Sequence, residues 1–299
     1  MNIIIAGATG YLGGKFIESL LYFPPPILNV YLEYNILILL REESLLPEAL
    51  KNNINVSICN INNDSLQDSI NNFSPDIIFC STCCYETDPE YLYKTVDANY
   101  VFPARLLQIA ATLEKTIRFI SIGTSLPPSL NLYTLTKKHF AELGVFFHEA
   151  GNIEFINISL ESFYGINEPS NRFITRSIIQ LKSNQDLLLT KGIQKRDFIY
   201  IDDVIDILLF LVDCKETSIL AKSEYTVPVG TGIAPSIKEI ILFLYDETHS
   251  KSNLKFGAVK MRKDEPSTAA DLCILRKLGY SKPLTHWHDG MRKVIGSIG

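Results

Sequence analysis

The sequence predicts an α/β fold, a doubly wound parallel sheet with a smaller C-terminal lobe. In the first half of the chain, short apolar runs alternate with longer segments of helical spacing, which is typical of parallel strands joined by helices. Most of these runs are continuously apolar rather than alternating, as in strands that are covered on both faces. A glycine-rich turn directly follows the first run, where such folds pass from strand to helix.

Strands and helices are expected in alternation through the first half. The expected strands are residues 2–6, 35–40, 56–59, 76–81, 117–122 and 154–159. The expected helices are residues 11–21, 91–113 and 132–149. Pro24, Pro25 and Pro26 break the chain after the first helix, because a proline cannot continue the helical hydrogen-bond ladder.

The order of elements changes after about residue 160. Short strands at 187–189 and 225–229 mix with helices at 203–212 and 236–245. We therefore expect residues 1–160 to form the first domain and residues 161–299 to form a smaller lobe. The segment at about residues 203–213 is expected to pack back on the first domain.

Composition argues against several classes of protein. The chain has 299 residues and a formal net charge of −5, with no long basic run, so we expect no nucleic-acid partner. No run reaches the ~18 apolar residues of a membrane span, and no charged segment precedes a long apolar one at the start. These features favour a cytoplasmic protein with no membrane partner and no targeting segment.

The cysteines Cys80, Cys83 and Cys84 fall at the end of an expected strand. A Cys-x-x-Cys pair can bind a metal or act in redox chemistry. No second such pair and no histidine at ligand spacing accompanies it, so we expect small buried hydrophobic side chains, reduced thiols and no metal.

A glycine triplet opens the first expected helix. The stretch from Gly7 to Gly13 also contains Gly10, and Thr9, Tyr11 and Leu12 lie between the glycines. Glycines allow a tight turn, a close approach of a pyrophosphate and close packing of helix on strand, and the helix N-terminus attracts phosphate. The sequence predicts that these residues bind a dinucleotide.

Arg41 follows the second expected strand, where an acidic residue would bind a ribose 2′-hydroxyl. An arginine there suits a 2′-phosphate and favours NADP over NAD, although NAD stays open. The alternative is an ordinary exposed arginine beside Glu42 and Glu43. Arg41 lies 28 residues after Gly13, beyond the usual ~20, and we interpret 24–34 as an insertion.

Tyr133 and Lys137 are spaced i and i+4, and therefore share one face of a helix that Asn131 can cap. A phenol is a poor acid or base at neutral pH, but a nearby ammonium lowers its pKa. The preceding strand ends near Thr124 and Ser125, whose hydroxyls can hold the same substrate oxygen. This arrangement predicts acid–base chemistry at an alcohol or ketone.

A resemblance to a known family extends over nearly the whole chain. It is carried by the glycine triplet, the set of Thr124, Tyr133 and Lys137, Asn99 and the block 196–203. The sequence resembles the extended short-chain dehydrogenase/reductases, or NAD-dependent epimerases and dehydratases, that act on nucleotide sugars. This resemblance implies a Rossmann dinucleotide-binding domain followed by a nucleotide-sugar-binding lobe.

The resemblance also implies roles for residues. Tyr133 is the acid/base, Lys137 holds the nicotinamide ribose and tunes Tyr133, and Thr124 binds the reacting oxygen, with Ser125 as the substitute. The remaining implied cofactor contacts are Asn60, Ile61 and Asn99.

Within this family the sequence is similar to the NADPH-dependent 4-ketoreductases that complete CDP-3,6-dideoxyhexoses, paratose and abequose, for O-antigen and lipopolysaccharide biosynthesis. The similar stretches are residues 123–128, 160–165, 192–201 and 256–259. The first and third favour the paratose enzyme. The implied substrate is a CDP-linked deoxysugar, and the family often forms homodimers.

The second lobe is expected to bind the diphosphate of such a substrate. Arg196 and Arg262 stand where the family places its diphosphate ligands, and Arg172 is a further candidate. Ser162 occupies a position that often contacts substrate. The alternative for each arginine is a surface ion pair, for example Arg196 with Asp197.

Asp197, Asp202 and Asp203 could hold a metal, but helix capping and pairing with the helix dipole are favoured.

Two other functions stay open at this stage. One is a nucleotide-sugar 4-epimerase with tightly bound NAD, against which Arg41 argues. The other is a non-catalytic NADP-sensing regulator, against which the Tyr133–Lys137 pair argues.

Overall fold

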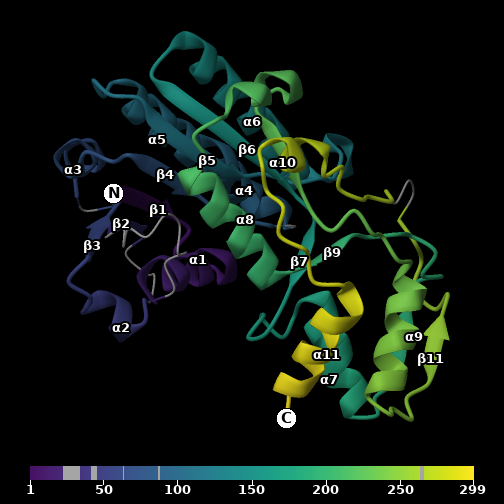
Figure 1. Ribbon diagram of the computed structural model, residues 1–299. Helices are drawn as coiled ribbons and strands as arrows, with labels where there is room; N and C mark the ends of the chain where they lie inside the picture. The colour runs from purple at the N-terminus through teal and green to yellow at the C-terminus, as the bar shows by residue number, and fades with distance from the viewer. Residues whose placement is uncertain (23–33, 42–45, 63, 87, 263–265) are drawn as a thin grey trace. The chain divides into compact units, whose positions relative to one another are not determined.

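The computed structural model describes residues 1–22, 34–41, 46–62, 64–86, 88–262 and 266–299. The expected break at Pro24–Pro26, most of the expected insertion at 24–34, and Glu42 and Glu43 lie outside these residues. The chain forms two compact units (Figure 1). One contains Met1–Ser159 and Leu208–Val227, and the other contains Leu160–Ile207 and Pro228–Gly299.

The first unit is built on the predicted doubly wound sheet. Its strands are β1 (Asn2–Ala6), β2 (Asn35–Leu40), β3 (Val56–Asn60), β4 (Ile77–Cys80), β5 (Ile117–Ile122), β6 (Ile153–Leu160) and β10 (Thr226–Val229). Their order in the sheet is β10-β6-β5-β4-β1-β2-β3, and β1 to β6 pair in parallel. The chain reverses its direction of winding between β1 and β4, and folds of this kind bind ligands at that point.

Helices cover both faces of this sheet (Figure 1). Helices α3 (Leu66–Phe73), α5 (Phe102–Ala111) and α6 (Leu132–Ala150) bury apolar side chains against one face. Helix α1 (Tyr11–Tyr22) packs on the other face, where the rings of Phe16 and Phe79 lie 4.3 Å apart between centroids. Continuous apolar strands follow from this double coverage, as predicted.

The single helix predicted for 91–113 is wrong in its middle. The segment runs through a 3₁₀ turn (Pro89–Tyr91), α4 (Leu92–Val96), a π-helical turn (Asp97–Val101) and α5. Pro103 lacks the N–H that would bond to residue 99 in a regular helix. The ladder widens there, and the N–H of Phe102 bonds to the carbonyl of Asp97.

The second unit combines two small sheets with helices. Strand β7 (Ser162–Tyr164) pairs in parallel with β9 (Phe198–Tyr200), and β8 (Leu187–Leu189) pairs with β11 (Leu254–Phe256). Its main helices are α7 (Phe173–Lys182), α9 (Ile237–Glu247) and α11 (Trp287–Ser297). Helix α9 packs against α7 and α11.

Three further helices complete the described chain. They are α2 (Glu48–Lys51), α8 (Ile201–Asp213) and α10 (Cys273–Lys277).

Candidate functional site

A cavity of about 390 Å³ opens at the carboxyl ends of β1, β2 and β4. It is lined by Gly7, Ala8, Thr9, Gly10, Leu39, Leu40, Arg41, Ile61, Ser81, Thr82, Cys83, Cys84, Ala98 and Phe102. The predicted glycine turn, Arg41 and Ile61 therefore lie around one cavity at the reversal point of the sheet. Tyr11, Leu12 and Gly13 continue into α1 outside this lining.

The glycine turn fits a pyrophosphate. Gly7 has a φ of +93°, and a Cβ there would lie 2.7 Å from the carbonyl carbon and Oγ of Ser81. A Cβ at Gly13 would lie 2.2 Å from the carbonyl oxygen of Gly7, so the helix can approach the turn only without a side chain. The amides of the first turn of α1 lack intrahelical acceptors and give that end positive character, which suits phosphate oxygens.

Arg41 lies on the rim of this cavity, directly after β2. Its guanidinium is half exposed and forms an ion pair with Asp97 at 3.4 Å. Asn60 is outside the lining, and its side-chain oxygen accepts a hydrogen bond from the Asn62 N–H at 3.1 Å. Of the two residues predicted after β3, the structure brings only Ile61 into the cavity.

The loop after β4 supplies lining residues that the sequence did not single out, Ser81 and Thr82. It also corrects the prediction for the cysteines, because Cys80 is buried whereas Cys83 is exposed and lines the cavity. The polar loop lies there because β4 is the neighbour of β1, so both strand ends meet at the same edge. Within the described residues, no cluster of His, Cys, Asp and Glu could hold a metal ion.

Asn99 supports this loop from behind. Its side chain is fully buried, accepts a hydrogen bond from the Cys84 N–H at 2.9 Å and donates to the Cys84 carbonyl at 2.8 Å. It lies in the π-helical turn, a type of irregularity that is frequent at functional sites. The structure therefore gives Asn99 a loop-holding contact rather than a place in the cavity lining.

Lys137 anchors helix α6 to two strand ends. Its side chain is 5% exposed, and its Nζ donates to the carbonyls of Thr82 at 2.7 Å and Ile122 at 2.8 Å. Burial lowers the pKa of Lys137, and the nearby thiols of Cys80 and Cys83 oppose that shift. The ammonium is thereby fixed between the carboxyl ends of β4 and β5.

Tyr133 lies one helical turn before Lys137 and is partly buried. Its ring contacts that of Tyr85, with 5.5 Å between centroids. The start of α6 is fixed as predicted, because the Asn131 side chain accepts the Thr134 N–H at 2.9 Å while the Thr134 side chain accepts the Asn131 N–H. The cap at Asn131 and the hydrogen bonds of Lys137 together fix the helix that carries the phenol of Tyr133.

Thr124 follows β5 and is 5% exposed. Its hydroxyl accepts a hydrogen bond from the Leu126 N–H at 3.2 Å, which leaves the hydroxyl hydrogen available for donation. Its carbonyl accepts from Ser159 at 3.4 Å, and Ser125 beside it is half-buried. Lys137 bonds the carbonyl of Ile122, so the helix of Tyr133 meets the strand that leads to Thr124.

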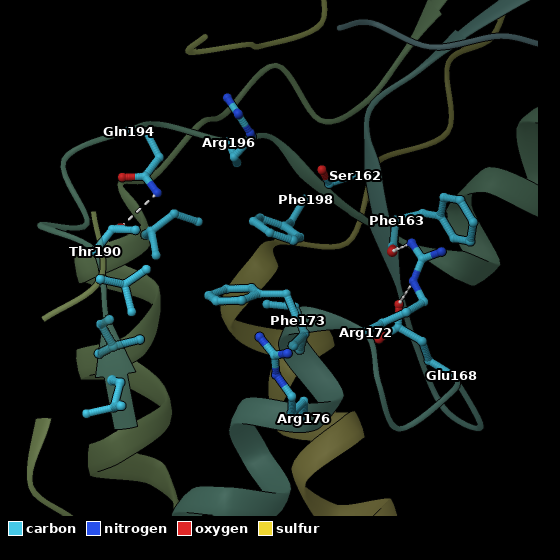
Figure 2. A pocket seen from close by; sticks show the side chains of 15 residues that line it. Ser162, Phe163, Glu168, Arg172, Phe173, Arg176, Thr190, Gln194, Arg196 and Phe198 are labelled. Carbon is cyan, nitrogen blue, oxygen red and sulfur yellow. Dashed lines mark hydrogen bonds and ion pairs between the residues drawn. The ribbon is translucent and has the colours of Figure 1, made fainter. Parts of the chain in front are cut away.

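The second unit contains a pocket of about 470 Å³ (Figure 2). It is lined by Ser162, Phe163, Glu168, Arg172, Phe173, Ile174, Arg176, Leu188, Leu189, Thr190, Gln194, Arg196, Phe198, Ile237 and Val259. Three of the predicted substrate residues, Ser162, Arg172 and Arg196, line it. Arg262 is exposed and is not part of the lining.

Arg172 is held by the protein itself. Its Nε lies 2.6 Å from a carboxylate oxygen of Glu168, its Nη2 donates to the Phe163 carbonyl at 3.0 Å, and its guanidinium lies over the Phe163 ring at 4.3 Å (Figure 2). Burial raises the pKa of Glu168, and Arg172 opposes this rise. These contacts favour the ion-pair alternative for Arg172.

The expected ion pair of Arg196 with Asp197 is not formed. Its Nη1 donates to the carbonyls of Lys195 and Pro266. The buried carboxylate of Asp197 instead accepts the N–H groups of Thr231, Gly232 and Ala270 at 2.8–3.1 Å. Asp197 therefore holds two loops together, and helix capping is wrong as its explanation.

Asp202 and Asp203 lie within the first turn of α8 rather than before it, because the helix already begins at Ile201. Asp203 accepts hydrogen bonds from the N–H and hydroxyl of Thr285. Pairing with the helix dipole holds for both residues, whereas a capping position does not.

Residues 3–221 match the family model described as the NAD dependent epimerase/dehydratase family. The chain belongs to this family. It is thus an NAD(P)-dependent enzyme of nucleotide-sugar chemistry, as the resemblance implied. None of the described helices is long and apolar enough to cross a membrane.

Two curated relatives are CDP-abequose synthases. That of Salmonella muenchen is 35% identical over 205 residues, which cover 66% of this chain and 68% of the relative. That of Salmonella typhimurium is 28% identical over 315 positions, covering 98% and 97%. The UDP-glucuronic acid 4-epimerase of Bacillus cereus, solved with UDP-glucuronic acid and NAD, matches with a TM-score of 0.82 at 21% identity, covering 99% of this chain and 98% of that one. This last similarity supports the fold.

Proposed function

We propose that the protein is an NADPH-dependent 4-ketoreductase of a CDP-linked 4-keto-3,6-dideoxyhexose. The observation that carries the proposal is the fixed arrangement of Tyr133, Lys137 and Thr124 in a chain similar to CDP-abequose synthases. Together they provide a phenol, a nearby ammonium and a hydroxyl with its hydrogen available. These are the groups that protonation of a ketone oxygen requires.

The cofactor is assigned to the cavity of the first unit. Gly7, Gly10 and the N-terminus of α1 would hold the pyrophosphate, and Ile61 would line the adenine end. Arg41 would exchange Asp97 for a 2′-phosphate, which supports NADP over NAD. When bound, the reduced nicotinamide supplies the reducing equivalent for C4 of the sugar.

The chain's own residues move and stabilise the proton. Tyr133 donates its phenolic hydrogen to the carbonyl oxygen at C4 as negative charge develops there. Thr124 donates a hydrogen bond to the same oxygen, with Ser125 next to it. Lys137 keeps the phenol acidic through its positive charge, and its two carbonyl acceptors hold that charge in place.

The nucleotide of the substrate is assigned to the pocket of the second unit. The aromatic rings of Phe173 and Phe198 suit the planar base, and Arg196 suits the diphosphate. Arg262 follows the lining segment at Val259 and stays a candidate for the same diphosphate. The C4 configuration decides between abequose and paratose, and the names of the curated relatives favour abequose.

The biological setting follows from the proposed substrate. A role in O-antigen and lipopolysaccharide biosynthesis is part of the proposal. A cytoplasmic location and a homodimer stay predictions.

The experiment mixes the protein with NADPH and CDP-4-keto-3,6-dideoxyhexose and follows the absorbance of the reduced nicotinamide. The proposal predicts one NADPH consumed per sugar reduced, with NADH a poorer substitute. NMR spectroscopy of the product then gives the configuration at C4. Interconversion of two sugar epimers without net NADPH consumption would identify a 4-epimerase, and dinucleotide binding without turnover would identify a regulator.

A further inference from the structure

Arg176 is a basic residue that belongs to none of the sequence motifs described above. It lies on α7, one helical turn after Arg172, and its exposed side chain lines the pocket of the second unit. In the described part of the chain, no residue forms an ion pair or a hydrogen bond with the Arg176 guanidinium. Its five N–H donors are therefore available to a ligand.

The other two arginines of this pocket are held in place by contacts with the protein. Arg172 is neutralised by Glu168 and also bonds the Phe163 carbonyl. Arg196 donates to the carbonyls of Lys195 and Pro266. Two guanidiniums thus line one pocket, that of Arg172 directly before α7 and that of Arg176 within the helix. The first supports the wall of the pocket, and the second is exposed to solvent.

The arrangement of the pocket separates Arg176 from Arg196. The rings of Phe173 and Phe198 stack with 6.2 Å between centroids and 28° between planes. Figure 2 shows Arg196 on one side of this pair and Arg176 on the other, next to Phe173. The diphosphate is proposed above to lie at Arg196. A nucleotide that extends from there along the rings of Phe173 and Phe198 would place its base next to Arg176.

The chemistry of a guanidinium discriminates between pyrimidines. Two parallel N–H groups match two adjacent acceptors, as in the pairing of arginine with guanine. Cytosine offers such a pair in N3 and O2. In uracil and thymine, N3 carries a hydrogen and is a donor. It would therefore face a guanidinium N–H, and no hydrogen bond could form.

We propose that Arg176 selects cytosine, and thereby CDP-linked over UDP-linked or dTDP-linked sugars, by donating two hydrogen bonds to N3 and O2 of the base. This inference rests on the proposed function, because it takes the pocket of the second unit as the nucleotide site. It assigns base selection to one side chain of α7.

The test compares CDP and UDP binding to the full-length protein by isothermal titration calorimetry. The wild type is expected to prefer CDP. Arg176→Lys keeps the positive charge but loses the planar fork, so it should lower the CDP/UDP affinity ratio by about tenfold while UDP affinity changes less than about threefold. Arg292→Lys is the control, because its guanidinium pairs with Glu247 and Asp289 and is not part of the pocket lining. It should leave that ratio unchanged.

Inorganic pyrophosphate serves as a third probe. If Arg176→Lys weakens CDP, UDP and pyrophosphate by the same factor, Arg176 is a phosphate ligand and the proposal is wrong. An unchanged CDP/UDP ratio in Arg176→Lys, or a wild type that binds both nucleotides equally, would also overturn it while the nucleotide site remained. A wild type that binds neither nucleotide would instead remove the proposed function.

Discussion

Lys137 shows how one buried side chain can position the residues of the proposed reaction centre. Two backbone carbonyls accept hydrogen bonds from its ammonium, one at the end of β5 and one in the loop that lines the cavity of the first unit. Because burial lowers its pKa, the charged form is lost at a lower pH than in an exposed lysine. Through its hydrogen bond to Thr82, Lys137 fixes the helix that carries Tyr133 against the loop that lines the cavity.

Lys137→Met should lower kcat by about 100-fold and raise the KM for NADPH. The phenol loses its neighbouring charge, and the Thr82 carbonyl loses the donor that fixes the loop. Steady-state kinetics measure both effects. Lys138→Met, the next residue on the same helix, is the control and should keep kcat within about twofold of the wild type. Equal kinetics in the two variants would contradict the role of Lys137.

The sequence predicted the placement of Tyr133, Lys137 and Thr124 better than the contacts of the arginines. Tyr133, Lys137 and Thr124 follow from local spacing, and the structure brings α6 to the end of β5 through Lys137. Arg172 was a candidate ligand and Arg176 was not considered, although the i, i+4 spacing of Glu168 and Arg172 was a signal of an ion pair. Which arginine keeps free donors depends on tertiary contacts that a single sequence does not display.

At the scale of elements, the connection from β1 to α1 leaves no room for a side chain at Gly13. Gly13 and Gly14 are neighbours in α1 with opposite surroundings. A Cβ at Gly13 would lie 2.2 Å from a backbone oxygen, whereas a Cβ at Gly14 would meet its nearest atom at 3.6 Å. The two positions form a matched pair.

Gly13→Ala should destabilise the protein by about 2 kcal/mol or more and weaken NADPH binding, because the strand and helix must move apart. Gly14→Ala should be neutral or stabilise the protein by up to ~1 kcal/mol, since alanine favours helix over glycine. Urea unfolding followed by far-UV circular dichroism measures both. A similar unfolding midpoint for the two variants would contradict this account of the turn.

Long, continuously apolar elements were predictable, whereas short ones were predicted only in part: β8 has the predicted bounds, but β7 and β9 were not predicted. Strands β1, β2 and β5 have the predicted bounds because their runs carry a strong burial signal. Strands β7 and β9 have three residues each and depend on pairing with each other. The π-helical turn before Pro103 also escaped prediction, since helical periodicity continues through it.

At the scale of the whole molecule, buried phenols make stability depend on alkaline pH. Burial raises the pKa of Tyr34 and of Tyr200 to about 12, and it also raises the pKa values of Tyr164 and Tyr280. Each is at most 5% exposed. A raised pKa in the folded state stabilises the fold below the unfolded pKa of ~10 and is lost as pH rises above it.

The free energy of unfolding should therefore fall steeply between about pH 10 and 12, by up to ~1.4 kcal/mol per pH unit for each of these tyrosines, and the urea midpoint should fall with it. The lowered pKa of Lys137 has the opposite effect on the free energy of unfolding as pH rises. It is a single group, whereas four tyrosines have a raised pKa. Fluorescence of Trp287, the single tryptophan, follows unfolding in the second unit. Tyr200→Phe should flatten the decline, and a midpoint that stays constant from about pH 9 to 11 would contradict the prediction.

The central claim is that the phenol of Tyr133 protonates the reacting oxygen. Its most direct test is Tyr133→Phe, which removes one oxygen from a partly buried ring and leaves the dinucleotide cavity unchanged. The account predicts that kcat with NADPH and CDP-4-keto-3,6-dideoxyhexose falls by at least about 100-fold, while the Kd for NADPH stays within about twofold. Near-native turnover in this variant would contradict the claim.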